Sequence, residues 1–447
     1  MRTFNQQSQL IQGNLALALA PALTPAGIDQ TPNFFQGFVA YPQVLARGLL
    51  VLADVVTTRY FNYTPEAMRD PILSAQGDRL RAECFSACNG VYARLDLLQS
   101  GFDGHIAYGT TNVDIGTELR TALTQIKQQD KLHMNIGSDG LAMLPIHNKD
   151  KNIIAMGEKI IERPVQMPER WIRALGNAAE IHKEMKNSFT IKKAAAQTFI
   201  ASLPPATGKN KSGWLTPTST GVKLMPRRTS SAVYVSGLHR LSALRRVMTN
   251  IESMTFYAPV EAEAGTFMLE VELPSMRLTM SLTAEAWRGY SGEGSLLESL
   301  AQPELLEDAE SILTTLEFHS MVSETWLANQ WKMSEKRVQG ALALLSVSGK
   351  LGFDAYENKY YHRELPHDPH RVSKDNPRLS AARNLLDGVK NISEHKWAVA
   401  SKDLEYLVTY DQAKETGSAK CTCTWYLNHQ NKRGPCKHIL AVQLLKL

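Results

Sequence analysis

The pattern of apolar and polar positions changes along the chain, and each change predicts different elements. Residues 1–184 mix short strand-like runs, such as Gly13–Ala20, with helical stretches at Val44–Arg59 and Gly116–Lys127. The last stretch repeats apolar residues three and four positions apart, which is the spacing of an amphipathic helix. Further on, Thr255–Leu282 alternates apolar and polar residues, so we expect two or three antiparallel strands there.

In residues 304–365, apolar residues at helical spacing are followed by two strand-like runs. The predicted helices are Leu305–Leu316, Val322–Trp331 and Glu335–Val347, and the predicted strands are Lys350–Asp354 and Lys359–Leu365. Ser334 is a good N-cap for the third helix because its hydroxyl accepts a hydrogen bond from a free backbone N–H. Three short helices followed by a β-hairpin are the element order of a winged helix-turn-helix, whose third helix enters the DNA groove in the DNA-binding version.

The composition is that of a globular protein. At 447 residues the chain is too long for one hydrophobic core, and 43% hydrophobic with 21% charged residues argues against disorder. Five cysteines are few and odd in number, so a disulfide scaffold is not expected. Leu15–Leu23 could imitate a signal-peptide core, but only Arg2 supplies positive charge before it. Val44–Val56 is shorter than the roughly 20 residues that span a bilayer. We therefore expect a cytoplasmic protein without a membrane partner.

Charge is distributed unevenly along the chain. Residues 185–250 contain no acidic residue but eleven lysines and arginines, Arg227 and Arg228 among them, whereas residues 285–325 hold nine acidic residues and one arginine. The two blocks could neutralise each other across a domain contact. Alternatively, the basic block is a surface for an anionic partner.

Four residues near the C-terminus have the spacing of a metal site. Cys421 and Cys423 form a C-x-C pair, and after a spacer of twelve residues Cys436 and His438 form a C-x-H pair. Three thiolates and one imidazole complete the closed tetrahedron of a structural zinc site, so we predict one structural Zn²⁺. Two strand-like runs, Trp397–Ala400 and Leu404–Tyr410, precede these ligands, and an apolar helix at about Lys437–Leu445 follows them. By contrast, Cys84 and Cys88 are interpreted as ordinary buried thiols on a helix.

This constellation resembles the SWIM zinc finger, whose pattern is C-x-C, a variable spacer and C-x-H. Three phrases elsewhere suit the stand-alone bacterial SWIM-type family, namely Gly37–Tyr41, Thr111–Asp114 and Tyr360–Pro366. The resemblance implies a DNA-binding or protein-interaction module. It also implies partners, because members of that family are often encoded beside a MoxR-type AAA+ ATPase and a von Willebrand A-domain protein.

Together, these patterns predict a multidomain α+β protein in four parts. The predicted parts are an α+β domain over residues 1–184, a basic segment with antiparallel strands over residues 185–290, a winged-helix-like domain over residues 291–370, and a linker helix with a ββ-knuckle-α SWIM zinc finger over residues 371–447.

Candidate nucleic-acid contacts follow from the basic residues in these parts. They are Lys432, Arg433 and Lys437 in the finger, Lys336 and Arg337 at the start of the third helix of the winged-helix segment, and Arg227 and Arg228 in the basic block. Trp425 and Tyr426 either stack on bases or form the small core of the finger, and the second interpretation is favoured for Trp425. The acidic first helix of the winged-helix segment would repel DNA.

Three functions are compatible with the sequence. The first is a non-enzymatic zinc protein that binds nucleic acid, DNA foremost. The second is an adaptor for protein partners. A zinc enzyme ranks last, because catalytic zinc keeps an open coordination position and this pattern fills all four. The chain also lacks a Walker A loop, so ATP hydrolysis is not expected.

Overall fold

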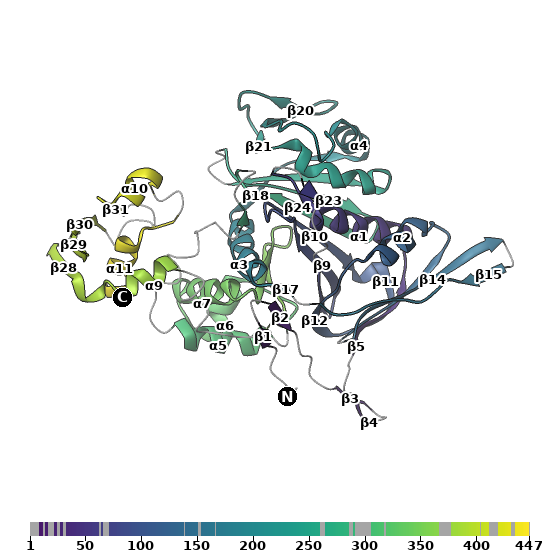
Figure 1. The fold of residues 1–447 in the computed structure, drawn as a ribbon, viewed down its shortest axis with the longest axis horizontal. Coiled ribbons are helices and arrows are strands. Elements are labelled where there is room, and N and C mark those ends of the chain that lie inside the picture. Colours follow the sequence, from purple (N-terminus) through teal and green to yellow (C-terminus); the bar gives the residue numbers. More distant parts are fainter. Residues whose placement is uncertain are drawn as a thin grey trace. The chain divides into compact units, whose positions relative to one another are not determined.

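A computed structural model gives the fold of the chain (Figure 1). It describes residues 9–11, 14–16, 22–24, 27–29, 33–61, 64–65, 71–137, 139–150, 153–165, 167–259, 264–285, 289–290, 305–316, 319–365, 377–402, 404–410, 419–430 and 434–446. The chain is a mixed α+β protein with several sheets, which confirms the predicted fold class at that level. Within the described residues, no helix is both long and apolar enough to span a bilayer.

The chain divides into two compact units. Unit 1 comprises Met1–Trp171, Glu184–Tyr290 and Arg363–Pro366, and unit 2 comprises Ile172–Lys183, Ser291–His362 and His367–Leu447. The chain therefore passes between the units several times. The sequence predicted four consecutive parts, whereas each of these units combines several separate segments. The four-part division therefore stays a prediction.

An eight-stranded antiparallel sheet forms the centre of unit 1, in the order β12-β8-β9-β10-β24-β23-β22-β18. Its strands are β8 (Ile72–Gln76), β9 (Arg79–Phe85), β10 (Val91–Leu98), β12 (Tyr108–Asn112), β18 (Met185–Lys192), β22 (Ser253–Pro259), β23 (Phe267–Leu273) and β24 (Met276–Leu282). Two meanders, β8-β9-β10 and β22-β23-β24, thus meet where β10 pairs with β24. The three strands β22 to β24 confirm the expectation for Thr255–Leu282.

A second sheet and four helices complete most of unit 1. The second sheet has the order β11-β5-β13-β14-β15, with β16 also paired to β14. Its strands are β5 (Asn33–Val39), β11 (Phe102–Ile106), β13 (Lys131–Gly137), β14 (Gly140–Asp150), β15 (Ile153–Met156) and β16 (Ile160–Glu162). The helices are α1 (Pro42–Val56), α2 (Thr117–Gln125), α4 (Lys193–Ser202) and the 3₁₀ segment η2 (Leu238–Asn250).

Smaller elements surround this core. A three-stranded sheet in the order β20-β19-β21 consists of β19 (Gly213–Thr218), β20 (Gly221–Met225) and β21 (Val233–Val235). Short strands occur at β1 (Gln9–Ile11), β2 (Asn14–Ala16), β3 (Ala22–Thr24), β4 (Gly27–Asp29), β6 (Thr58–Arg59), β7 (Thr64–Pro65) and β17 (Met167–Pro168), and a 3₁₀ turn at η1 (Gln99–Gly101). The run predicted at Gly13–Ala20 includes β2, and the rest of it lies outside the described residues.

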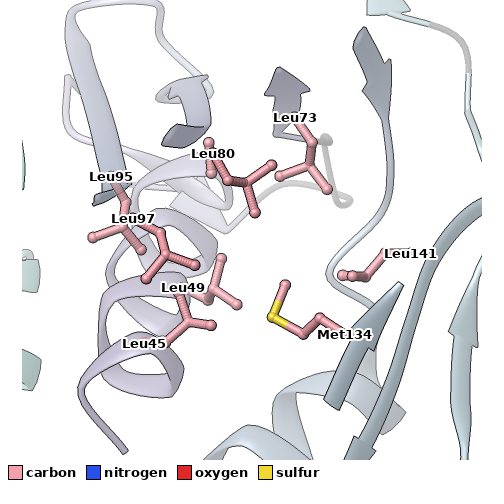
Figure 2. Close-up of a pocket in the computed structure, with 9 residues that line it drawn as sticks. Leu45, Leu49, Leu73, Leu80, Leu95, Leu97, Met134 and Leu141 are labelled. Atoms are coloured by element: carbon pink, nitrogen blue, oxygen red, sulfur yellow. The ribbon is translucent and has the colours of Figure 1, made fainter. Parts of the chain in front are cut away.

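Helix α1 lies against both sheets, which explains why its sequence is apolar almost all round. Leu45 and Leu49 of α1 face Leu95 of β10 and Met134 of β13 across a small cavity (Figure 2). The cavity has a volume of about 20 Å³ and leucine, alanine and methionine walls. Such a space is too small for a ligand and offers water no polar partner. It is a packing gap in the core.

Unit 2 contains three helices joined to a small sheet. The elements are α5 (Leu305–Leu316), β25 (Met321–Val322), α6 (Glu324–Trp331), α7 (Glu335–Val347), β26 (Leu351–Asp354) and β27 (Lys359–His362), and the sheet order is β25-β27-β26. The Ser334 hydroxyl accepts from Arg337 N–H, which is the cap expected for α7. The second helix begins later than predicted, because Val322 pairs with Tyr360 in the sheet.

The C-terminal part of unit 2 is a four-stranded sheet with helices. Its elements are α9 (Pro377–Arg383), η5 (Leu386–Gly388), β28 (Val389–Ser393), β29 (Lys396–Ser401), β30 (Leu404–Thr409), β31 (Lys420–Cys421), α10 (Thr424–His429) and α11 (Lys437–Lys446), and the sheet order is β28-β29-β30-β31. The helix α3 (Glu169–Lys183) begins in unit 1 and continues into unit 2.

Buried charges fix the register at the centre of the eight-stranded sheet. Asp96 of β10 lies opposite Arg81 of β9, and one of its oxygens is 3.4 Å from Arg81 Nη1. The other oxygen accepts a 3.0 Å bond from Arg94 Nε. On the other side of β10, Arg277 of β24 lies opposite Asp96 and 4.0 Å from Glu270 of β23. A one-residue slip would separate these charges, so they specify one pairing.

Asp96→Ala should therefore destabilise unit 1 strongly. The change removes the carboxylate that Arg81 and Arg94 share, and breaking a buried ion pair from one side costs about 3–5 kcal/mol. Chemical denaturation measures the loss in the free energy of unfolding. Asp103→Ala, at an exposed position on β11, is the control and should change stability by less than about 0.5 kcal/mol. A loss at Asp96 no larger than that of the control would contradict the buried-pair interpretation.

Candidate metal centre

The four residues of the predicted metal site come together in the structure. Cys421, Cys423, Cys436 and His438 are all buried, and their potential ligand atoms lie within 4.8 Å of one another. His438 Nδ1 is 3.7 Å from Cys421 Sγ and 4.0 Å from Cys436 Sγ. This buried group is suitable for a metal ion.

Local structure places each of these residues. Cys421 ends β31, whose pairing with β30 sets its position. Cys423 is the N-cap of α10, and Cys436 directly precedes α11, in whose first turn His438 lies. The two sulfurs at helix starts therefore face free backbone N–H groups and the positive end of a helix dipole, which both favour negative charge.

Backbone amides surround the sulfurs. Cys423 N–H donates to Cys421 Sγ at 3.4 Å, Tyr426 N–H to Cys423 Sγ at 3.4 Å, and Ile439 N–H to Cys436 Sγ at 3.5 Å. Each sulfur thus accepts one amide hydrogen bond, and such bonds stabilise thiolates.

The three thiols cannot all ionise easily on their own. A hydrogen bond with Cys436 raises the pKa of Cys421 far above its usual value, and burial raises that of Cys423. The same hydrogen bond, now donated by Cys421, lowers the pKa of Cys436 to about 4. The cluster therefore favours one thiolate stabilised by its neighbours. A cation among the sulfurs would remove this competition and hold all three as thiolates.

Aromatic rings enclose the cluster. The Tyr406 ring of β30 stacks on His438, with ring centroids 4.2 Å apart and planes at 22°. Trp425 of α10 packs against the hydrophobic core of unit 2, and Arg378 of α9 lies 4.6 Å from its ring centroid. Arg378 also donates to the Pro435 carbonyl at 3.2 Å, next to Cys436. One face of Trp425 is thus occupied from within the chain, as the core interpretation requires.

Basic residues predicted to contact nucleic acid differ in their surroundings. Lys432 and Arg433 lie outside the described residues. Lys437 is partly buried and donates to Ser401 Oγ at 2.9 Å. Arg337 is bound to Asp308 of α5 through two hydrogen bonds of 2.9 and 2.6 Å, whereas the neighbouring Lys336 is exposed.

Arg227 and Arg228 are exposed and follow β20, and the Arg228 guanidinium lies 5.7 Å from the Trp214 ring centroid of β19. These two arginines belong to unit 1, whereas the other candidates belong to unit 2. The predicted contacts are therefore not one continuous surface of a single unit.

The prediction of a helix at Cys84 and Cys88 is wrong. Cys84 lies on β9 and is buried, and Cys88 lies in the turn after that strand and is partly buried. The four-residue spacing of the cysteines imitated a helix. The sequence of β9, RLRAECF, alternates polar and apolar residues, and this alternation was the signal that could have identified the strand, although all seven of its residues are buried. Sequence reasoning also missed α10 in the spacer, which has six residues and no apolar period, and strand β28.

No known protein-family profile matches the sequence, and no curated protein matches it. Among solved structures, the chain is similar to the proliferating cellular nuclear antigen of Entamoeba histolytica, with 12% identity and a TM-score of 0.36 over 56% of this chain and 99% of that one. It is also similar to the PCNA2–PCNA3 complex of Sulfolobus tokodaii, with 8% identity and a TM-score of 0.38 over 56% of this chain and 98% of that one. A likeness at this level assigns no function to this chain.

Tyr406→Ala should weaken metal binding without removing a ligand. The substitution frees the imidazole of His438 to rotate, and residues that orient a ligand typically contribute about 10- to 100-fold in affinity. Competition with a chelator measures the change. Leu404→Ala, at an exposed position of the same strand, is the control and should leave affinity unchanged. Equal affinities for the two variants would show that the ring does not orient the ligand.

Proposed function

We propose that this chain is a non-enzymatic zinc protein that binds nucleic acid, DNA foremost, through basic surfaces. In this proposal its C-terminal part is a SWIM-type finger holding one structural Zn²⁺. The buried cluster of three cysteines and one histidine carries the proposal, because those residue types in a closed group are the ligands of structural zinc.

The distances support a zinc-sized ion. With Zn–S bonds of about 2.3 Å and Zn–N bonds of about 2.0 Å, the edges of a tetrahedral Cys₃His site are about 3.5–3.8 Å. The Cys421–His438 distance of 3.7 Å and the Cys436–His438 distance of 4.0 Å are close to these edges. Soft thiolate ligands favour zinc over magnesium or calcium. Four protein ligands would leave no position for a reacting water, so the ion would stabilise the finger.

The basic block supports a contact with phosphate groups. Contacts within unit 1 reduce the number of its residues that are available to a phosphate. Three of its eleven basic residues are occupied within unit 1: Arg240 is buried, Arg245 donates to the Leu203 carbonyl, and Arg246 pairs with Asp54 at 2.8 Å. The residues of this block that are exposed around the small sheet β20-β19-β21 are Lys209, Lys211, Lys223, Arg227 and Arg228. We therefore place the main phosphate contact at this sheet, called the basic sheet below.

A winged helix would be a second, weaker contact. The element order from α5 to β27 is the order of that fold, and α7 would be its recognition helix. However, Asp308 already pairs with Arg337, whose side chain is 46% exposed, whereas the exposed Lys336 takes no part in that ion pair. In this proposal the segment contributes little to affinity.

An adaptor function is the alternative. Leu404, Leu407 and Leu427 of the finger expose more than half of their surface, at 62%, 52% and 65%. Exposed apolar side chains are favourable for a protein contact and unfavourable for a phosphate contact. The resemblance to the SWIM-type family would make a MoxR-type AAA+ ATPase and a von Willebrand A-domain protein the partners.

Zinc content tests the metal assignment. The unchanged protein should hold about one zinc per chain, and a Cys421→Ser/Cys436→Ser variant should hold almost none, because two of the four ligands are lost. Elemental analysis after dialysis measures the ratio. Cys88→Ser serves as the control and should keep its zinc. Zinc that persists in the double variant would refute the ligand assignment.

Salt dependence tests the nucleic-acid contact. The logarithm of the DNA association constant should fall with the logarithm of salt concentration, and Arg227→Ala/Arg228→Ala should reduce that slope by about 1.8, or about 0.9 for each lost phosphate contact. Fluorescence anisotropy with duplex DNA measures both slopes.

Arg337→Ala is the matched control, since that guanidinium is paired with Asp308, and its slope should equal that of the unchanged protein. Absence of DNA binding at low salt would refute the nucleic-acid proposal. The adaptor would then be favoured if a pull-down recovers an ATPase without nucleic acid. A Leu404→Ser/Leu407→Ser variant should no longer recover that ATPase.

A further inference from the structure

The two faces of the basic sheet differ in character. Leu215 of β19 lies opposite Val233 of β21, and both side chains are almost fully buried. Because successive side chains of a strand point to opposite faces, Trp214 and Thr216 of β19 lie on the other face from Leu215. The face that carries Leu215 and Val233 is thus the packed one. The opposite face, called the outer face below, is partly open.

The register places aromatic, apolar and basic side chains together on the outer face. Trp214 lies opposite Met225 of β20 on one side and opposite Tyr234 of β21 on the other, and Thr216 lies opposite Lys223. The Trp214 and Tyr234 rings meet edge to face, with centroids 5.3 Å apart and planes at 68°. Both rings are partly exposed, Met225 is 40% exposed, and Lys223 is exposed. The centre of the outer face is therefore an aromatic and apolar surface that solvent reaches.

Basic residues border the aromatic rings. The Arg228 guanidinium lies over the Trp214 ring, 5.7 Å from its centroid, and the adjacent Arg227 is exposed. No carboxylate of a described residue forms an ion pair with Arg227, Arg228 or Lys223. Residues 185–250 also contain no acidic residue. The outer face therefore presents positive charge around an aromatic centre, which complements a ligand that has both phosphate groups and flat rings.

The segment that carries the two arginines is anchored at two points. Thr229 Oγ1 is 3.0 Å from Thr216 Oγ1 of β19, and the Ser231 carbonyl accepts a 3.0 Å hydrogen bond from Ser188 Oγ of β18. These contacts hold the residues after β20 close to the outer face. Because groups that are positioned in advance lose less conformational freedom on binding, this anchoring favours the arginines as ligand contacts.

A single strand fits this surface better than a duplex. In a duplex the bases stack on one another inside the helix, so a ring on an open sheet face cannot reach their flat surfaces. The bases of a single strand are free to stack on aromatic side chains, while its phosphates contact basic residues along the same path. Trp214 offers such a ring, and the guanidinium plane of Arg228 offers a second stacking surface beside it.

Hydroxyl groups on the outer face do not favour RNA. A protein distinguishes RNA from DNA at a site by its contacts with the 2′-hydroxyl group. Thr216 Oγ1 bonds with Thr229 Oγ1, and Thr218 Oγ1 donates to the Gly221 carbonyl at 3.1 Å. Since these threonine hydroxyls are already engaged within the chain, they offer no contact that would select RNA.

We propose that the outer face of the basic sheet binds single-stranded DNA, with bases stacked on Trp214 and phosphates held by Lys223, Arg227 and Arg228. This inference rests on the proposed nucleic-acid function, and it assigns the form of the nucleic acid and the contact that recognises it. Every base has a flat π surface, so stacking of this kind gives little sequence preference.

Removal of the Trp214 ring tests the stacking contact. The full chain is titrated against labelled oligothymidylate, and fluorescence anisotropy measures binding. Trp214→Leu keeps an apolar side chain but loses the aromatic ring, and it should weaken binding about 5- to 150-fold. Trp214→Phe should restore much of the affinity. Phe38→Leu, which removes an exposed ring from β5 in the second sheet of unit 1, is the control and should bind as the unchanged protein does. Equal affinities for Trp214→Leu and the unchanged protein would overturn the proposal.

Salt dependence separates the ring from the phosphate contacts. Trp214→Leu should leave the salt slope of binding unchanged, because stacking releases no counterions. Arg227→Ala/Arg228→Ala should reduce the slope by about 1.4, or about 0.7 for each phosphate contact on a single strand. A smaller slope in Trp214→Leu would show that the ring acts only by positioning Arg228, and would contradict the stacking contact.

A crosslink maps the contact without a variant. Circular dichroism checks that Trp214→Leu is folded. If it is not, ultraviolet crosslinking of oligothymidylate to the unchanged protein, followed by peptide mass spectrometry, still decides. The crosslink should lie at Trp214 or Tyr234, and crosslinks confined to other parts of the chain would refute the proposal.

Competing nucleic acids separate this inference from the function on which it rests. Oligothymidylate should bind more tightly than a duplex of the same length. Duplex binding that is as tight or tighter would overturn the inference and leave the nucleic-acid function standing, whereas no binding of either form at low salt would refute both. Oligodeoxyuridylate and oligouridylate differ only in the 2′-hydroxyl group, and the deoxy strand should bind at least as tightly. Tighter binding of the RNA strand would overturn the assignment to DNA.

Discussion

The register of the β10–β24 pair is the constraint on which unit 1 depends. These strands join two meanders that lie about 180 residues apart in the chain, and every other strand of the eight-stranded sheet takes its position from one of them. Hydrophobic contacts alone tolerate small shifts, whereas buried ion pairs do not. The Asp96–Arg81 ion pair fixes β10 against β9. On β24, Arg277 lies opposite Asp96 and 4.0 Å from Glu270 of β23, so buried charges occupy both sides of the β10–β24 junction. The small basic sheet belongs to the unit whose sheet this pairing fixes.

Buried polar and ionic groups occur in both units, but they have different roles in the two. In unit 1, arginines and carboxylates fix strand positions. In unit 2, three sulfurs and an imidazole collect at one point where a cation is the natural partner. The ionic groups of the sheet are balanced within the chain, and the sulfur cluster is not. This difference is why the cluster points to an external ion.

Features that depend on local spacing can be predicted from the sequence alone. The helix Glu335–Val347 has the predicted bounds because its apolar period and its Ser334 cap are both local. The grouping of Cys421, Cys423, Cys436 and His438 in one buried cluster was predictable, because residue type and spacing are local features. Features that depend on distant partners were not predictable. The pairing of Arg246 with Asp54 spans 192 residues and removes one charge from a block that composition alone counts as a surface. In β9 the alternation of polar and apolar residues is local and could have identified Cys84 as a strand residue, whereas the burial of the charged side chains of this strand depends on distant partners.

The ion pair between Arg363 and Glu83 has a consequence for synthesis of the protein. Two hydrogen bonds of 2.7 Å join these buried side chains within unit 1, although 280 residues separate them. Strand β27 ends at His362, directly before Arg363 and three residues before the end of the strand predicted from the sequence. On the ribosome, Glu83 receives this arginine only after residue 363 has been made. Unit 1 therefore cannot complete its interior during the synthesis of its own sheets, and its final closure follows translation of most of the chain.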